Sequence, residues 1–216
     1  MKALRILITA GPTIEPIDPV RFISNRSTGY MGYELARIAG ERKHIVTLIS
    51  GPTAIRPPAG VKFLRIETAR ELQREIRRHL KKSDALLMSS AVSDFRPAFF
   101  SRKKIKSKKR LTLKLVKNPD ILGSIRLRRR KGKVLVGFSL ETENLLENAA
   151  KKLKTKKLDL IVANRISPKS TPFGGGRKSV YLLGKHRDRR KLEKATKARI
   201  ARAILDTVEE LCYTSN

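Results

Sequence analysis

The sequence predicts an α/β protein in which helices cover both faces of a mostly parallel sheet. Short apolar runs rich in β-branched residues alternate along the chain with segments whose apolar residues recur at helical spacing. This alternation is typical of parallel sheets, because a helix usually connects one parallel strand to the next. A chain of 216 residues can bury one substantial core, so we expect a single domain over residues 1–216.

The first half of the chain supplies four of the predicted strands, at residues 4–9, 44–50, 61–66 and 84–89. Apolar residues at helical spacing predict a first helix after Gly29. A second helix is expected to begin after Thr68, with Glu71 as the partner of Thr68 in a capping box. Between the first strand and the first helix we expect a long loop that contains Pro12, Pro16 and Pro19.

The second half continues the alternation after a basic interruption. Strands are predicted at 111–116, 134–138 and 158–163, and an edge strand at 179–183. Helices are predicted over 144–156 and 194–211, and another with Pro119 as its first residue. The basic stretch 102–110 has no apolar periodicity, so we expect residues 97–116 to form a flap that carries a mobile loop.

The charge of the chain favours phosphorylated partners. Fifty Lys and Arg residues against nineteen Asp and Glu give a net charge of +31, which attracts polyanions. A nucleic-acid-binding protein is therefore one alternative, although aromatic residues are only 5% and the basic residues are spread along the chain. We do not expect nucleic acid to be a specific partner.

The lone cysteine and the apolar runs bear on where the protein acts. Cys212 cannot form a disulfide within the chain or build a zinc site, which favours a reducing compartment, the cytoplasm. No apolar run approaches the roughly 18 residues that cross a bilayer, so no membrane partner is expected. The three histidines lie apart in the sequence, without metal-ligand spacing.

Several unusual segments follow predicted strands directly. They are the loop at Gly11, the turns at 89–94 and 138–142, and the helix start at 118–120. Parallel sheets bind ligands beyond the carboxyl ends of their strands, where such segments meet. The sequence therefore predicts a site at this rim.

The small residues and glycines of 27–32 precede the first helix, where free N–H groups and the helix dipole can bind an anion. A capped helix with glycines for close packing explains the same pattern about equally well. A Rossmann-like NAD(P)-dependent reductase stays a second alternative, although the full dinucleotide fingerprint and an acidic residue at the end of the second strand are missing.

An ordered series of segments resembles the phosphopantothenoylcysteine synthetase family, over roughly residues 4–185. The segments are 10–32 (AGPTIEPIDPVRFISNRSTGYMG), 91–97 (AVSDFRP), 104–106 (KIK), 116–122 (VKNPDIL), 136–142 (VGFSLET), 150–153 (AKKL) and 156–164 (KKLDLIVAN). Any one segment could arise by chance, but the ordered series is specific.

The resemblance implies a Rossmann-like fold and a ligase that joins 4′-phosphopantothenate to cysteine. Bacterial members are similar in using CTP: the carboxylate attacks the α-phosphate, pyrophosphate leaves, and the cysteine amine displaces CMP from the acyl-cytidylate. Mg²⁺ is expected on the nucleotide phosphates rather than on protein side chains. The resemblance also implies a homodimer with the flap directed toward the neighbouring subunit. The choice between CTP and ATP stays open, and we expect the preceding decarboxylase to be a separate chain.

Site residues follow from the same resemblance. It implies a catalytic amide at Asn25 and a nucleotide-contacting lysine at Lys104, selected by the KIK pattern. It assigns nucleotide binding to Met88, Ser89, Ser90, Asp94, Lys104, Pro119, Asp120, Ile121, Leu122, Phe138, Lys152 and Lys156. It assigns the phosphate and substrate loop to Gly11, Ser27, Thr28, Gly29 and Gly32.

Ordinary structural roles compete with these assignments when each residue is taken alone. An asparagine before a helix is commonly a cap, and an aspartate in a turn commonly forms the turn. Phe138 ends a strand that is expected to be buried, and lysines on a helix face usually meet solvent. The chain also departs from the family pattern, with Tyr30 where lysine is frequent, Thr28 where serine is frequent, and Ser89 and Ser90 where small apolar residues are usual.

Overall fold

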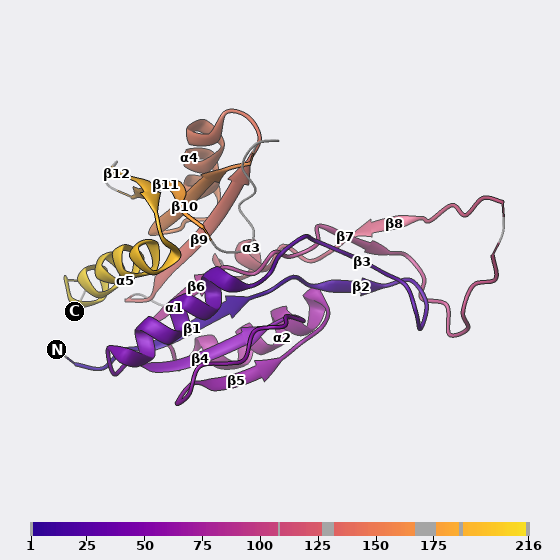
Figure 1. Ribbon diagram of the computed structural model, residues 1–216, viewed down its shortest axis with the longest axis horizontal. Coiled ribbons are helices and arrows are strands. Elements are labelled where there is room, and N and C mark those ends of the chain that lie inside the picture. Colours follow the sequence, from indigo (N-terminus) through magenta and orange to yellow (C-terminus); the bar gives the residue numbers. More distant parts are fainter. Residues whose placement is uncertain (1, 108, 127–131, 167–175, 186–187, 215–216) are drawn as a thin grey trace.

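The structure is a computed structural model and describes residues 2–107, 109–126, 132–166, 176–185 and 188–214 (Figure 1). Its centre is an eight-stranded sheet in the spatial order β12-β11-β10-β9-β6-β1-β4-β5. The strands are β1 (Arg5–Ala10), β4 (Ile45–Ser50), β5 (Lys62–Arg65), β6 (Ala85–Met88), β9 (Val134–Glu141), β10 (Leu160–Arg165), β11 (Lys178–Gly184) and β12 (Arg189–Ala195). Pairing is parallel from β10 to β5, whereas β11 pairs antiparallel with both β10 and β12, and this confirms the predicted mostly parallel sheet.

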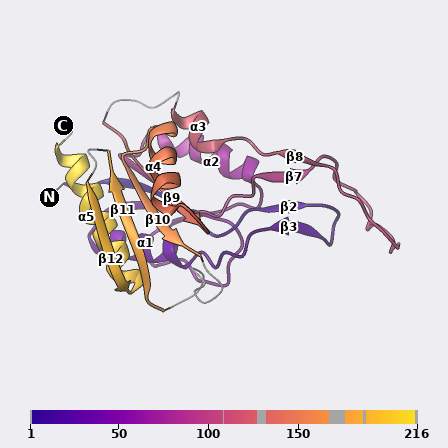
Figure 2. The same ribbon diagram turned by 90° about the horizontal axis from the view of Figure 1, so that it is seen from above.

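Helices cover both faces of this sheet, as predicted. They are α1 (Tyr30–Glu41) and α5 (Lys197–Thr214) on one face, and α2 (Ala69–Leu80), α3 (Ile121–Arg126) and α4 (Leu145–Thr155) on the other (Figure 2). The pleat of β1 explains why its sequence is apolar throughout. Ile6 and Ile8 belong to the core beneath α1 and α5, whereas Leu7 belongs to the core beneath the other three helices.

The start of α2 confirms the predicted capping box. The amide of Glu71 donates to the Thr68 hydroxyl at 3.2 Å, and the Glu71 carboxylate accepts from the Thr68 amide at 3.4 Å. Two of the N–H groups that the first turn would leave unpaired are thereby satisfied. The chain then passes from α2 directly to β6, and the turn that follows β6 is one of the segments at which the sequence predicts a site.

Two hairpins leave the body of the molecule side by side (Figures 1 and 2). We call them the first arm, in which β2 (Ile14–Pro16) pairs with β3 (Phe22–Ser24), and the second arm, residues 95–117, in which β7 (Phe95–Pro97) pairs with β8 (Leu115–Lys117). The second arm coincides with the predicted flap; its residue 108 lies outside the described residues.

A buried aspartate joins the two arms. Asp18 accepts hydrogen bonds from the amide of Ile105 at 3.1 Å and from the guanidinium of Arg21 at 2.5 Å. The same guanidinium donates to the carbonyl of Ile105 at 2.6 Å. Burial alone would raise the pKa of Asp18, but the hydrogen bonds from Arg21 and from nearby amides outweigh it and hold the pKa well below its usual range. The backbone beside Lys104 is thus fixed to the first arm.

Several predicted elements of the second half need correction. The strand predicted at 111–116 is only Leu115–Lys117 and belongs to the second arm rather than to the main sheet. The helix predicted to start at Pro119 begins at Ile121, because the carboxylate of Asp120 accepts from the amide of Gly123 and caps the turn instead.

The C-terminal part and the proline-containing loop also differ from the predictions. The strand predicted at 179–183 is not at the edge of the sheet, because β12 pairs with its outer side. Since β12 extends to Ala195, α5 begins at Lys197 rather than at residue 194. The loop with three prolines contains β2 and β3. Proline is compatible with a two-stranded arm because every strand there has a free edge.

Among the residues that the structure describes, no helix has both the length and the apolar character that a membrane span requires.

Candidate functional site

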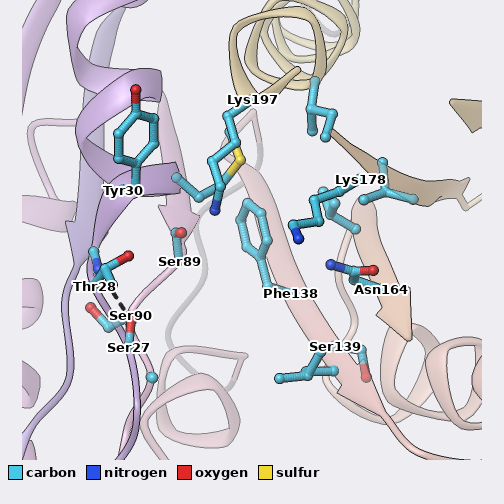
Figure 3. A pocket seen from close by; sticks show the side chains of 17 residues that line it. Ser27, Thr28, Tyr30, Ser89, Ser90, Phe138, Ser139, Asn164, Lys178 and Lys197 are labelled. Atoms are coloured by element: carbon cyan, nitrogen blue, oxygen red, sulfur yellow. Dashed lines mark hydrogen bonds between the residues drawn. The ribbon is translucent and has the colours of Figure 1, made fainter. Parts of the chain in front are cut away.

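Two pockets adjoin at the carboxyl ends of the parallel strands, where the sequence predicted a site. The glycine-loop pocket has a volume of about 180 Å³ and lies between the loop before α1 and the ends of β9 and β10 (Figure 3). The Asp94 pocket has a volume of about 540 Å³ and lies between the turn after β6, the start of α3 and the helix α4. Ser90 and Phe138 line both pockets, so the two cavities share a wall.

Three of the five predicted loop residues line the glycine-loop pocket, namely Ser27, Thr28 and Gly29. Gly29 has φ 75°, and a Cβ there would stand 2.7 Å from the Thr53 methyl, so only glycine fits without strain. Gly11 and Gly32 do not line the pocket but allow close packing beneath it. A Cβ on Gly32 would stand 2.6 Å from the Cβ of Ala10.

The N-terminus of α1 faces this pocket without a competing acid. In the described part of the chain no side chain caps α1, and its first turn contains no acidic residue. The loop before α1 instead forms a hydrogen bond within itself, in which the amide of Gly29 donates to the Ser27 hydroxyl at 3.3 Å. The positive end of the helix dipole therefore remains available to an anion.

The Asp94 pocket brings together the predicted nucleotide-binding residues, except for Ser89 and Lys104. Ser89 lines the adjoining glycine-loop pocket. Lys104 lines neither pocket, because it lies on the second arm beside Ile105, which Asp18 holds away from the body (Figure 1). Within one chain, the structure does not bring Lys104 together with the other predicted site residues.

Lys152 of α4 and Lys156, the residue that caps the C-terminus of this helix, both line the Asp94 pocket. The ammonium of Lys152 donates to the carbonyl of Phe138 at 2.8 Å, and Lys156 forms an ion pair with Asp120. Burial lowers the pKa of Lys152, although the carboxylates of Glu141 and Asp94 act in the opposite direction. A phosphate that enters the pocket would offset the cost of desolvating this cation.

Asn25 is not the cap of α1, a position that Gly29 takes. Its side-chain amide instead donates to the carbonyl of Ala91 at 3.1 Å, and Ala91 lines the glycine-loop pocket. An amide nitrogen carries two hydrogens, so a second donor remains beyond this bond. The predicted catalytic amide therefore lies at the border of the site.

The structure adds residues that the sequence did not single out. Lys178 at the start of β11, Lys197 at the start of α5 and Asn164 in β10 all line the glycine-loop pocket (Figure 3). Asn164 had a usable signal, since it follows the apolar run of a parallel strand toward the predicted rim. The two lysines had none, because they are two of the fifty Lys and Arg residues of the sequence.

A second buried carboxylate supports the Asp94 pocket from behind. Glu15 is 2% exposed and accepts from the amide of Ala69 at 3.0 Å, and it also hydrogen-bonds the side chain of Asn118, which lines the pocket. Burial raises the pKa of Glu15 despite these hydrogen bonds. The side-chain amide of Asn118 in turn donates to the carbonyl of Ser93 at 2.9 Å. This bond joins the end of the second arm to the turn after β6.

No group of three or more His, Cys, Asp or Glu side chains within the described ranges is placed to hold a metal ion. The cations that line the two pockets are lysine side chains, which suit phosphate groups rather than metals.

Comparison with known proteins agrees with this geometry. A family model described as the DNA/pantothenate metabolism flavoprotein C-terminal domain matches residues 1–212. The coenzyme A biosynthesis bifunctional protein CoaBC of Borreliella burgdorferi is 40% identical over 208 residues, which are 95% of this chain and 52% of that protein. The chain thus spans about half the length of this curated relative.

Solved structures give the same result for the fold. A crystal structure of the C-terminal domain of coenzyme A biosynthesis bifunctional protein CoaBC has a TM-score of 0.85 at 34% identity, covering 99% of this chain and 98% of that one. A Cab2 mutant in complex with phosphopantothenate-cysteine has a TM-score of 0.78 at 17% identity, covering 98% of this chain and 88% of that one, and shares the fold. By the match over residues 1–212 and the 40% identity, the chain belongs to the DNA/pantothenate metabolism flavoprotein C-terminal domain family.

Proposed function

We propose that this chain is a phosphopantothenate–cysteine ligase, which joins 4′-phosphopantothenate and L-cysteine at the expense of CTP, in the cytoplasm. The observation that carries the proposal is the pair of pockets that share Ser90 and Phe138 as a wall. One pocket can hold a nucleoside triphosphate while the other holds a phosphorylated acid, so that the α-phosphate and the carboxylate meet at the common wall. The family to which the chain belongs supports the same activity.

In the first step, a carboxylate oxygen of 4′-phosphopantothenate attacks the α-phosphorus of CTP. The bond from the α-phosphorus to the bridging oxygen breaks, and pyrophosphate leaves with that electron pair. Lys152 and Lys156 line the pocket proposed for the nucleotide and lower its repulsion toward the attacking carboxylate. Mg²⁺ is expected on the phosphates, where it neutralises further charge.

In the second step, the amine nitrogen of cysteine attacks the acyl carbon of the acyl-cytidylate. The carbon–oxygen bond to CMP breaks, CMP leaves, and the new amide nitrogen releases a proton to solvent. Negative charge develops on the carbonyl oxygen during the attack. The free donor of Asn25, fixed beside Ala91, is our candidate for stabilising that oxygen.

The proposal includes a homodimer that is formed through the arms. Large apolar side chains lie exposed on the two hairpins, including Val20, Phe22, Phe99, Phe100 and Leu115, and Phe99 is 82% exposed. Exposed apolar groups of this density are typical of a surface that a partner covers. The second arm of one subunit would then carry its Lys104 to the pockets of the other, where it contacts the nucleotide.

The proposal is tested by incubating the purified chain with 4′-phosphopantothenate, cysteine, Mg²⁺ and either CTP or ATP. We expect release of pyrophosphate and formation of the amide product with CTP, and much less with ATP. Efficient turnover with ATP would refute the nucleotide assignment but keep the ligase. Absence of pyrophosphate release with both nucleotides would refute the ligase itself.

A further inference from the structure

A cavity outside the candidate site lies between the helix α4 and the strand β11, and we call it the α4 cleft. Its volume is about 660 Å³, which is larger than that of either pocket of the candidate site. Helix α4 packs on β9 and β10 and reaches β11, while β12 lies further out in the sheet (Figure 2). On the opposite face, α5 packs against both β11 and β12. This edge of the sheet is therefore covered by a helix on one face and hollowed on the other.

The floor of the α4 cleft is apolar. Leucines from three segments line it, namely Leu146 and Leu153 of α4, Leu158 before β10, and Leu183 of β11. Leu158 is fully buried, whereas the other three are half-buried. An apolar group that covers these three side chains would remove their remaining surface from water, which favours binding.

The rim of the α4 cleft is cationic. Its basic residues are Lys154, Lys157, Lys185 and Arg189, and Asp188 is the one acidic residue among the described residues of the lining. The ammonium of Lys185 lies 3.1 Å from the carboxylate of Asp159, and the guanidinium of Arg189 lies 4.8 Å from the centre of the Tyr181 ring. These contacts hold two of the cations beside the cleft, and the rim is complementary to an anionic group.

The α4 cleft is separate from the candidate site. None of the described residues that line it also lines the glycine-loop pocket or the Asp94 pocket. Helix α4 stands between the two regions, since Lys152 lines the Asp94 pocket, whereas Leu153 and Lys154 line the cleft. Basic residues occur along the whole chain, so a cationic rim alone would not indicate a ligand. An apolar floor below the rim does.

We propose that the α4 cleft binds a small amphiphilic anion, a carboxylate that carries an unbranched alkyl chain. The alkyl chain lies against the leucines, and the carboxylate accepts charge-assisted hydrogen bonds from Lys154 and Arg189 at the rim. A cavity of this volume, with apolar walls and few polar groups, is typical of small-molecule sites, which span roughly 300–1,000 Å³. A stable protein interface involves about 20–30 residues on each side, more than the eleven described residues that line the cleft. The site is independent of the proposed function.

The first test measures, by calorimetry, the binding of decanoate, octanoate and decyltrimethylammonium to the purified chain, each below the concentration at which it forms micelles. We expect decanoate to bind and octanoate to bind roughly 10-fold more weakly, because two fewer methylene groups are buried. The cationic decyltrimethylammonium should not bind. Absence of decanoate binding, or equal affinities for decanoate and octanoate, would overturn the site.

The second test uses variants of exposed residues of α4. Ala150 lines the cleft, and the ring of Ala150→Phe would fill the cleft without a change of charge, so decanoate should bind at least roughly 10-fold more weakly. Lys154→Glu should weaken binding roughly 5-fold, the scale of one exposed ion pair. Lys151→Glu makes the same change of charge in the same helix, but Lys151 belongs neither to the cleft nor to the two pockets, so it is the matched control. Wild-type affinity of Ala150→Phe, or equal losses in Lys154→Glu and Lys151→Glu, contradicts the proposal.

A third measurement separates the α4 cleft from other places at which decanoate could bind. The titration is repeated with saturating CTP and 4′-phosphopantothenate, and we expect decanoate still to bind. Decanoate that no longer binds lies in the candidate site, which overturns the cleft as its position. Light scattering with and without decanoate should give the same mass, whereas dissociation of an oligomer by decanoate would show that a second copy of the chain covers the cleft. A chain that fails to release pyrophosphate would refute the proposed function and leave this site untouched.

Discussion

The side-chain amide of Asn25 donates a hydrogen bond to the carbonyl of Ala91 at 3.1 Å, across 66 positions of the sequence. This bond joins the loop that leads into α1 to the turn that follows β6, so two separate strand ends are held in one geometry at the rim. It uses one of the two donors of the amide and orients the other. The loop before α1 is therefore fixed relative to both pockets before any substrate binds.

Replacing Asn25 should separate the two half-reactions. In Asn25→Ala we expect kcat/KM for amide formation to fall roughly 10²- to 10³-fold, the loss typical of one oxyanion donor. The first half-reaction should proceed, so the acyl-cytidylate accumulates and can be detected by mass spectrometry after an acid quench. Asn25→Asp should behave alike, since a carboxylate cannot donate. Normal amide formation in either variant would remove Asn25 from the mechanism.

Gly32 should tolerate no side chain, whereas Gly40 in the same helix should. A Cβ on Gly32 would stand 2.7 Å from the carbonyl oxygen of Thr9, so Gly32→Ala should lower the free energy of unfolding by about 1–3 kcal/mol. A Cβ on Gly40 would make only an ordinary contact at 3.7 Å. Gly40→Ala should therefore gain up to about 1 kcal/mol from helix propensity. Urea unfolding of both variants measures the difference, and equal effects would contradict the close packing beneath the loop.

The charged side chain of Lys152 should destabilise the folded chain when no nucleotide is bound. Burial holds the pKa of Lys152 below 10.5, so its folded state disfavours the charged form. The contribution of this group is favourable above pH 10.5 and is lost as the pH falls through the lowered pKa. At neutral pH, Lys152→Met should thus melt at a higher temperature than the wild type, and should lose most of the stabilisation that CTP gives.

The exposed Lys151 of the same helix provides the control for that comparison. Lys151→Met should leave both the melting temperature and its response to CTP close to those of the wild type. A Lys152→Met variant that is less stable than the wild type without nucleotide would show that the ammonium stabilises the fold, and the account of its burial would be wrong.

Asp18 should control the order of the second arm. Its pKa lies well below the usual 3.8, so its contribution to stability is fully present above that pH and is lost as the pH falls through the lowered pKa. Asp18→Asn keeps one acceptor but loses the ion pair with Arg21, and should expose the basic arm to trypsin at neutral pH. Asp206→Asn, which removes an exposed partner of Arg42, is the control. Equal digestion of both variants would contradict the link between the arms.

In the proposed dimer each site combines residues of both subunits, and this leads to a quantitative prediction. Asn25→Ala and Lys104→Ala should each be inactive as homodimers. In a mixed dimer, one of the two sites would combine the wild-type Asn25 of one subunit with the wild-type Lys104 of the other. Refolding the two variants together at equal amounts should restore about a quarter of wild-type activity, given random pairing of subunits in a two-fold dimer. No recovery would mean that Lys104 acts within its own chain or not at all.

The body of the fold could be predicted from the sequence because its signals are local. The apolar run of β1 and the capping box at Thr68 and Glu71 depend on neighbouring residues only. The first arm escaped prediction because β2 and β3 are only three residues long and β2 contains Pro16, so their pairing leaves no periodicity. The sequence of β12 is mostly charged, since an edge strand buries little, and so it does not resemble a strand.

The candidate site was predictable where it follows the carboxyl ends of parallel strands. Asp94 and Phe138 lie at the same rim for that reason, and the structure brings them together. Lys178 and Lys197 reach the site through an antiparallel strand and a C-terminal helix, whose positions depend on contacts distant in the sequence. Charge alone could not select them. The position of Lys104 on the second arm likewise depends on contacts at Ile105.

The central claim is that the acid attacks the α-phosphate of the nucleotide at the wall between the two pockets. Its most direct test uses 4′-phosphopantothenate labelled with oxygen-18 in the carboxylate, together with cysteine, CTP and Mg²⁺, and mass analysis of the products. The account predicts that one labelled oxygen passes from the carboxylate to CMP. Label in inorganic phosphate or pyrophosphate would contradict it, and so would CMP that carries no label.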